Sequence, residues 1–212
     1  NSIVAAGENA CILHYDRNDA EVKDGDLILI DAGCEYKYYA SDITRTFPAN
    51  GTFNPQQRAI YELVLKAQDS AIDAVQPGAP WDAPHNASVR VITQGLIKLG
   101  LIEGTLAKAI KAEAYRDFYM HRVGHWIGID VHDVGDYKID EKWRLLEPGM
   151  VTTIEPGIYI APDNKHVPKK WRGIGVRIED DVLVTKNGNR VLTTGIPKTV
   201  AEIETFMAQA KQ

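Results

Sequence analysis

Cysteine is scarce in this sequence, which holds only Cys11 and Cys34 among its 212 residues. The two lie in apolar surroundings and form no Cys-x-x-Cys motif, so a thiolate zinc site and a redox pair are both disfavoured. We expect two reduced thiols in the core. A chain of this length buries a sizeable core without disulfides or a structural metal, so neither is needed for folding.

Long apolar runs and a strong charge of one sign are also missing. No uninterrupted apolar stretch reaches the roughly 18 residues that cross a bilayer, so we expect no membrane-spanning segment. The formal net charge of -5 gives no general attraction to phosphate backbones, which argues against a nucleic-acid partner. Hydrophobic residues make up 44% and charged residues 25%, the proportions of an ordinary globular protein.

The order of the expected elements predicts one α+β domain. The expected strands cover residues 2–6, 11–15, 27–31, 38–47, 151–160 and 174–185. The expected helices run from Asn54-Pro55 to Pro77-Gly78, along an apolar face from Val89 to Leu99 that ends at Gly100, over about 105–115, and onward from a capping box at Thr199. No repeat and no linker rich in glycine, serine or proline divides the chain.

Asp31 and Asp42 are the first candidate site residues. Asp31 ends an apolar run, and Asp42 follows it by eleven positions. A hairpin with its two-residue turn at Tyr36-Lys37 places the two aspartates directly opposite each other, with Cβ atoms about 5 Å apart. Two like charges at that distance are destabilising unless cations lie between them. The alternative is that both are solvated turn residues.

Three of the six histidines, His121, His125 and His132, fall within twelve positions. The interleaved glycines indicate backbone brought close to a ligand, with imidazoles directed at it. A lone histidine is usually a packing residue, but packing explains this clustering poorly. His85 and His166 are isolated among polar residues, so we expect both at the surface.

Glu155 and Glu179 stand in strand-like segments, where a charge is costly without a partner. We therefore expect both carboxylates to be buried and bound. Arg177 lies two residues before Glu179, so in an extended strand both side chains point to the same face. The arginine is then placed to orient a ligand carboxylate. A plain salt bridge on the strand face is the alternative.

The charges of this set favour a dinuclear metal centre. Two divalent cations cancel the four carboxylates, and His125 adds one nitrogen ligand. Oxygen-rich ligation with a single imidazole favours manganese, cobalt, iron or zinc over copper or a thiolate zinc site. Two such ions activate a water and polarise a carbonyl, which is what amide hydrolysis needs.

Five segments carry these residues and resemble, in order, the motifs of the pita-bread metallopeptidases. They are Asp31-Ala32-Gly33, Ser41 to Phe47, Gly124-His125 with His132-Asp133, Ile154 to Gly157, and Arg177 to Asp180. Within that family, the sequences of these motifs are most similar to those of the Xaa-Pro aminopeptidases, aminopeptidase P. The resemblance implies an α+β pita-bread fold, a pseudo-twofold antiparallel sheet with flanking helices. It covers essentially the whole chain, so residues 1–212 are expected to be the catalytic domain, without the N-terminal domain that the family also carries.

The resemblance also implies site roles. Two manganese ions are expected on five ligands: Asp31, Asp42, His125, Glu155 and Glu179. His14, His121 and His132 match the family's active-site histidines, which contact the substrate and help to move protons. Glu155 is expected to share in the proton transfer, and Arg177 to support the site. Arg122 departs from the family pattern, because a small residue is expected there.

The implied activity is hydrolysis of the bond between an N-terminal residue and a penultimate proline, so the expected partners are peptides with proline at position two. Prolidase, which cuts only dipeptides, shares the five ligands and is the closest alternative. The sequence of residues 126–133 is less similar to that of methionine aminopeptidase. A pita-bread module that binds peptides or histones without catalysis is a further alternative, although such modules typically lose ligands. We also expect a cytoplasmic enzyme that is a homo-oligomer in its full-length form.

Overall fold

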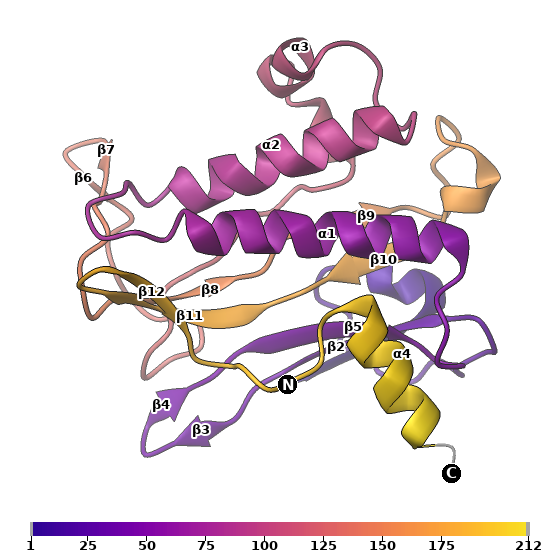
Figure 1. Ribbon diagram of the computed structural model, residues 1–212, viewed down its shortest axis with the longest axis horizontal. Coiled ribbons are helices and arrows are strands. Elements are labelled where there is room, and N and C mark those ends of the chain that lie inside the picture. Colours follow the sequence, from indigo (N-terminus) through magenta and orange to yellow (C-terminus); the bar gives the residue numbers. More distant parts are fainter. Residues whose placement is uncertain (1, 211–212) are drawn as a thin grey trace.

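Helices α1 and α2 lie side by side over the strands in the computed structural model, which describes residues 2–210 (Figure 1). The four α-helices are α1 (Pro55–Asp73), α2 (Ala83–Lys98), α3 (Leu106–Lys111) and α4 (Val200–Gln209). The strands of the N-terminal part are β1 (Ile3–Ala6), β2 (Leu27–Ala32), β3 (Glu35–Tyr36), β4 (Tyr39–Ala40) and β5 (Ile43–Pro48). Those of the C-terminal part are β6 (Lys138–Ile139), β7 (Lys142–Trp143), β8 (Val151–Ile154), β9 (Gly157–Ile160), β10 (Ile174–Arg177), β11 (Asp180–Thr185) and β12 (Gly188–Val191).

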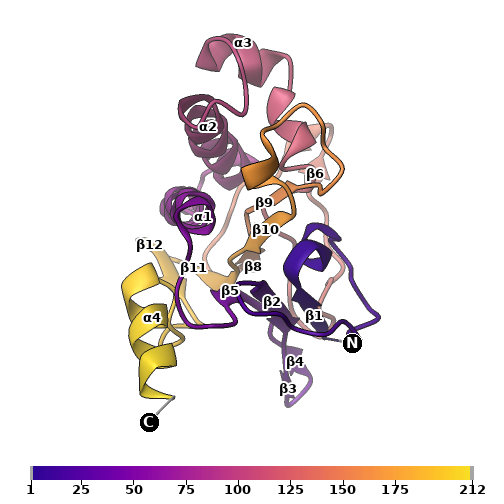
Figure 2. The same cartoon turned by 90° about the vertical axis from the view of Figure 1, so that its right-hand side faces the viewer.

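All strand pairings are antiparallel among the described residues. One three-stranded sheet has the order β1-β2-β5 and comes from the N-terminal part; another has the order β12-β11-β8 and comes from the C-terminal part. The β9-β10 pair lies beneath α1 in Figure 1, and in Figure 2 it stands beside α1 and above the β1-β2-β5 sheet. The predicted α+β class with an antiparallel sheet and flanking helices is therefore confirmed.

Helix α1 begins where the sequence predicts. The Asn54 side chain accepts hydrogen bonds from the backbone N–H groups of Gln56 and Gln57, and the Gln57 side chain accepts one from the Asn54 N–H in return. Pro55 occupies the first turn, where its missing N–H costs nothing. The capping box predicted at Thr199 likewise begins α4.

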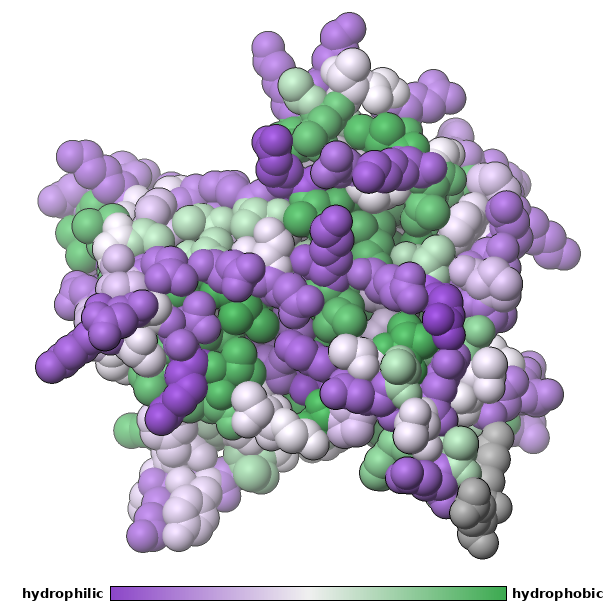
Figure 3. Space-filling model, viewed as in Figure 1, coloured by the Kyte–Doolittle hydropathy of each residue, from purple (hydrophilic) through white to green (hydrophobic). Residues whose placement is uncertain are grey.

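The largest apolar core lies between the two long helices and the β9-β10 pair. Ile60 and Val64 of α1, Ile92 of α2, and Ile158 and Val176 of the strands all have 0% exposure. On the face seen in Figure 1, hydrophilic side chains project from the helices, and apolar side chains show mainly in the recesses between them (Figure 3). Burial of this core holds the strands that carry the site in fixed positions.

The segment 11–15 is not the strand that we predicted. A short 3₁₀ helix, Gly7–Cys11, is followed by turns. It packs on β10 at Gly175, where an added Cβ would lie 2.3 Å from the backbone oxygen of Ala10. Because residue 175 is a glycine, the backbone of the 3₁₀ helix can approach β10 this closely. The chain therefore packs on β10 here and does not add a strand to a sheet.

Both cysteines are free, as predicted, but neither is a core residue: Cys11 is partly buried and Cys34 is exposed. Cys34 lies just after β2, where the chain leaves the sheet, so local apolarity was a poor guide to its burial. The prediction that His85 lies at the surface is also wrong, because its position on α2 directs the side chain into the protein and leaves it 9% exposed. His166 is exposed, as predicted.

The hairpin that carries Asp31 and Asp42 has a different register from the one predicted. Tyr36 pairs with Tyr39, so the turn residues are Lys37 and Tyr38, both with positive φ. Asp31 consequently pairs with Thr44 and not with Asp42. The change is by two positions and keeps both aspartates on the same face, where they are diagonal neighbours.

No helix in the part of the chain from residue 2 to residue 210 is long and apolar enough to cross a bilayer.

Candidate metal centre and active site

A cavity of about 850 Å³ opens between the N-terminal and C-terminal sheets. Every site residue that the sequence predicts lines it: His14, Asp31, Asp42, His121, His125, His132, Glu155, Arg177 and Glu179. These residues come from segments up to 165 positions apart, so only the folded chain brings them together.

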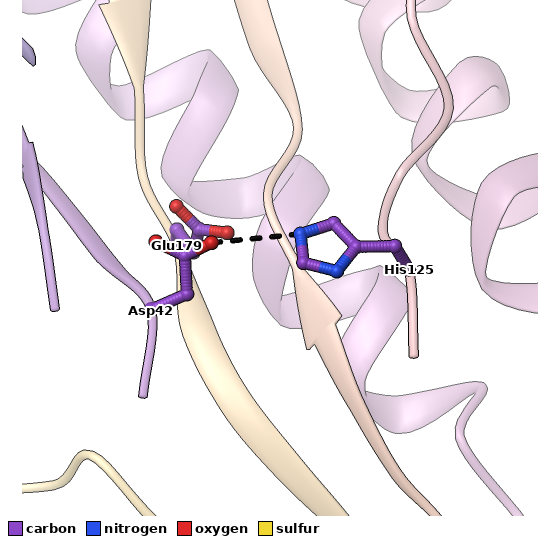
Figure 4. A group of neighbouring side chains, drawn as sticks. All are labelled: Asp42, His125 and Glu179. Carbon is purple, nitrogen blue, oxygen red and sulfur yellow. Dashed lines mark ion pairs between the residues drawn. The ribbon is translucent and has the colours of Figure 1, made fainter. Parts of the chain in front are cut away.

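Asp42, His125 and Glu179 form the tightest cluster in this cavity. One ligand atom from each lies within 4.8 Å of the others. Figure 4 shows the carboxylates of Asp42 and Glu179 side by side, facing the imidazole of His125. His125 Nε2 lies 3.5 Å from Asp42 Oδ2. Two carboxylates and an imidazole converging on one point form a donor set that divalent transition metals accept.

Glu155 and Asp31 extend the cluster on either side. Glu155 Oε1 lies 3.6 Å from His125 Nε2. Asp31, on β2, receives a hydrogen bond from Nη2 of Arg177, with 2.6 Å between Asp31 Oδ2 and the nitrogen. The arginine therefore contacts a carboxylate of the predicted ligand set.

The carboxylates of the cluster repel one another. Burial raises the pKa of Glu179 well above its usual range, and the charges of Glu155, Asp42 and Asp31 raise it further. Burial likewise raises the pKa of Glu155 to about 7. Four acids share this site with one arginine and one histidine, so a divalent cation bound among them would relieve the repulsion.

The loop that carries His125 is held against β8 by backbone hydrogen bonds. The Thr153 N–H donates to the oxygen of His125 at 3.0 Å, and the Glu155 N–H donates to that of Val123 at 2.7 Å. Gly124 lies so close to β8 that an added Cβ would be 1.9 Å from the Thr153 oxygen. The glycine thus permits the approach that places His125 beside Glu155.

His121 belongs to a buried network behind the cluster. Its Nδ1–H donates to the backbone oxygen of Arg122 at 2.7 Å, and its Nε2 accepts from the hydroxyl of Tyr159 at 2.8 Å. Burial lowers the pKa of His121 to about 4, so the ring is neutral at pH 7. Arg177 also donates to the Tyr159 oxygen, at 3.2 Å.

Tyr159 is a functional candidate that our sequence reasoning missed. A usable signal existed, because Glu155 and Tyr159 are four residues apart in an extended segment, where every second side chain shares a face. Tyrosine is a common core residue, however, and the sequence does not show that Tyr159 contacts His121 and Arg177.

His132 and His14 lie at the cavity's exposed side. The His132 ring meets the His125 ring edge-on, with 4.3 Å between centroids. Arg122 extends away from the cluster, with its guanidinium carbon 5.1 Å from the centre of the Trp143 indole. The arginine that departs from the family pattern therefore does not crowd the carboxylates.

Comparison with known proteins identifies the family. A model of metallopeptidase family M24 matches residues 1–186. The chain belongs to metallopeptidase family M24. Among curated relatives, the Xaa-Pro aminopeptidase of Haemophilus influenzae is 57% identical over 98% of this chain and 48% of its own length. The Xaa-Pro aminopeptidase of Escherichia coli is 51% identical over 100% and 48%.

Solved structures of M24 relatives show the same fold. Aminopeptidase PepP of Pseudomonas aeruginosa superposes with a TM-score of 0.98 at 69% identity, over 99% of this chain and 48% of that one. The fold is therefore the pita-bread fold, as predicted. The chain spans about half the length of the relatives that it matches.

Membership of a metallopeptidase family implies divalent-metal binding, and the M24 chain described here has donors that fit it. Asp42, His125 and Glu179 converge within one coordination sphere's reach. Burial, reinforced by neighbouring carboxylates, raises the pKa values of Glu155 and Glu179, and a bound cation would oppose both effects.

Proposed function

We propose that this chain is the catalytic domain, residues 1–212, of a dinuclear-metal Xaa-Pro aminopeptidase. The observation that carries the proposal is the convergence of four carboxylates and one imidazole in a single cavity. Two relatives that are 57% and 51% identical to this chain are named Xaa-Pro aminopeptidase, and their names support the substrate class.

We assign two manganese ions to a five-residue ligand set: Asp31, Asp42, His125, Glu155 and Glu179. When bound, the ions supply Lewis acidity that polarises the scissile carbonyl and lowers the pKa of a water. Diagonal placement of Asp31 and Asp42 on one face lets both contribute to the same centre. His132 stays outside the set, since a sixth protein ligand would occupy a position that substrate or water needs.

Proton movement is assigned to groups that face the cavity. Glu155 Oε1 accepts a proton from the attacking water and returns it to the nitrogen of the leaving proline. That nitrogen carries no hydrogen while it is in the peptide bond, so its protonation is a demanding step. His132 and His14, at the exposed side, are placed to donate hydrogen bonds to the peptide.

His121 and Arg177 act through other groups in this assignment. Both ring nitrogens of His121 already have partners, so His121 fixes the hydroxyl of Tyr159. Arg177 holds the Asp31 carboxylate with one nitrogen and reaches the Tyr159 oxygen with the other. A contact between His121 and substrate remains a prediction.

Peptide length separates this activity from the closest alternative. The full-length protein, reconstituted with manganese, is assayed on Ala-Pro and on Ala-Pro-Ala. An aminopeptidase cleaves the tripeptide efficiently. Efficient cleavage of Ala-Pro alone establishes a prolidase instead, and binding of both peptides without cleavage of either establishes a non-catalytic module.

A cytoplasmic location and a homo-oligomeric full-length form also stay predictions. Light scattering of the full-length protein and fractionation of the cells that produce it check them.

A further inference from the structure

A second pocket, of about 580 Å³, adjoins the metal cavity. Arg122 and Gly124 line both, so the two spaces meet at the loop that carries His125. The rest of the second pocket comes from the segment before α2, from residues 135–137 and from the β6-β7 hairpin that follows them; the hairpin and the start of α2 lie at the same end of the molecule (Figure 1). None of the residues that we assign to metal binding or catalysis lines it.

Two cations lie on one aromatic ring in this pocket. The guanidinium carbon of Arg122 is 5.1 Å from the centre of the Trp143 ring, and Lys138 Nζ is 4.7 Å from the same centre. Lys138 and Trp143 are paired residues of the β6-β7 hairpin, so the strand register sets their contact. A planar indole holds a guanidinium in place without neutralising its charge.

In the described part of the chain, neither cation has an acidic partner. Within residues 2–210, no carboxylate lies within ion-pair distance of Arg122 or Lys138, although Asp136 lines the same pocket. Arg122 is exposed, so its donors are available to a ligand. Two unneutralised cations at the edge of a site that is otherwise rich in carboxylates attract an anion.

The wall of the pocket is a packed aromatic cluster. The Trp81 ring lies 4.1 Å from that of Trp126 and 4.8 Å from that of Tyr137, centroid to centroid. The Tyr137 hydroxyl oxygen also accepts a hydrogen bond from the backbone N–H of Trp126. Such a wall is formed before a ligand arrives, so little ordering is needed on binding.

Chain geometry places Arg122 within reach of a bound peptide. Arg122 and His125 are three positions apart in the chain, which limits their Cα distance to about 11 Å. An extended peptide advances about 3.3 Å per residue, so the third and fourth residues of a substrate whose first peptide bond lies at the metals are about 5 and 8 Å beyond that bond, which is within this limit.

We propose that Arg122 and Lys138, held on Trp143, form a subsite for a carboxylate on the part of the substrate that follows proline. The inference rests on the proposed aminopeptidase function: only one residue precedes the scissile bond, so a second pocket is open mainly to residues that come after it. The carboxylate comes either from an acidic side chain at position three or four or from the free C-terminus of a short peptide.

Two substrate pairs test the subsite and separate the sources of the carboxylate. The manganese-loaded full-length protein is assayed on Ala-Pro-Glu-Ala-amide against Ala-Pro-Gln-Ala-amide, and on Ala-Pro-Ala against Ala-Pro-Ala-amide. We expect kcat/KM to favour the acidic member of at least one pair about fivefold at low salt, with the preference falling as salt is added. The substrate pair that shows this preference identifies the source of the carboxylate.

Arg122→Gln is expected to reduce that ratio to near one, and Arg122→Lys to keep part of it. The ratio cancels any general loss of activity. Arg190→Gln, which changes an exposed arginine of β12, is the matched control and should keep the parental ratio. A parental protein with no preference, or an Arg122→Gln protein with an unchanged one, overturns the subsite.

Binding of product peptides supplies a readout that does not depend on turnover. Calorimetry compares Pro-Glu-Ala-amide with Pro-Gln-Ala-amide, and Pro-Ala with Pro-Ala-amide. If no peptide is cleaved but the acidic peptides bind more tightly through Arg122, the subsite stands and the proposed function fails. If cleavage occurs and neither assay discriminates, the function stands and the subsite fails. The subsite is also overturned if Arg122 speeds only the cleavage of substrates with an acidic first residue, because that side chain precedes the scissile bond.

Discussion

Arg177 holds Asp31 across the cavity, from β10 to β2, with 2.6 Å between the guanidinium nitrogen and the carboxylate oxygen. Burial raises the pKa of Asp31, and the positive charge of Arg177 opposes that rise. The arginine therefore favours the ionised form of this partly buried carboxylate and orients it, which are both conditions for metal binding.

Arg177→Met is expected to weaken manganese binding about 10- to 100-fold, because Asp31 loses the partner that orients it. Arg177→Lys should recover part of the affinity, since a lysine restores the charge but not the fork of donors that also reaches Tyr159. Titration of the metal-free protein with manganese measures both. Arg190→Met is the control, and parental affinity in Arg177→Met would contradict the role.

Asp42→Asn should lower the metal content of manganese-reconstituted protein from two ions per chain. The substitution removes one charge and one ligand oxygen from the tightest part of the cluster. Neighbouring carboxylates are then left unbalanced, so the melting temperature in manganese should also fall. Elemental analysis and thermal denaturation check this, with Asp163→Asn, at an exposed position, as control. Unchanged metal content would remove Asp42 from the ligand set.

His132→Ala should keep its metal and lose its turnover. Loss of a positioned hydrogen-bond donor or proton carrier costs about 10²- to 10⁴-fold in rate, whereas the five proposed ligands remain. Rate, metal content and melting temperature are measured on one preparation, beside His166→Ala. If His132 is instead a packing residue against His125, the variant will melt earlier and keep most of its turnover.

Gly124→Ala should disturb the site through the backbone. The new Cβ meets the Thr153 backbone oxygen, which cannot move without shifting β8. We expect a loss of about 1–3 kcal/mol in the free energy of unfolding, together with weaker metal binding. Gly95→Ala on α2 is the comparison, because its Cβ meets only the movable end of the Leu63 side chain. Equal losses of metal affinity in the two variants would contradict the explanation.

His85 should make the protein sensitive to mild acid. Burial, reinforced by the charges of Arg122 and Arg116, lowers the pKa of His85 to about 4 from 6.5. Between these pH values the unfolded chain binds a proton that the folded chain does not, so this contribution to stability is complete above pH 6.5 and is lost as the pH falls toward 4. The loss amounts to roughly 3 kcal/mol.

His85→Gln removes that titration, so its free energy of unfolding should fall less steeply from pH 6.5 to pH 4 than that of the parent. Denaturant unfolding at four pH values measures the slope. His166→Gln, at an exposed position, should keep the parental slope. A parental slope in His85→Gln would show that His85 is protonated equally in both states.

Much of the secondary structure was readable locally. The start of α1 follows from the capping chemistry of Asn54 and Pro55, which lie next to the groups that they satisfy. The strand 11–15 was wrong because the decisive contact, the approach of the Ala10 backbone to Gly175, is made 165 residues away along the chain. The hairpin turn was wrong by one position, since Lys37 and Tyr38 both adopt positive φ without a glycine to signal it.

Some features of the candidate site likewise follow from the sequence, and others follow only from the tertiary structure. Residue types, charge balance and the resemblance of the motifs to those of a known family are properties of the chain alone, and together they selected nine residues that all line one cavity. Which carboxylate contacts which partner depends on strand register and packing. Neither the Arg177 hydrogen bond to Asp31 nor the link from His121 through Tyr159 follows from spacing, because the partners lie on segments that are far apart along the chain. Arg122 shows the same limit: the sequence marks it as unusual, and only the fold places it on Trp143, beside Lys138 and at the edge of the metal cavity.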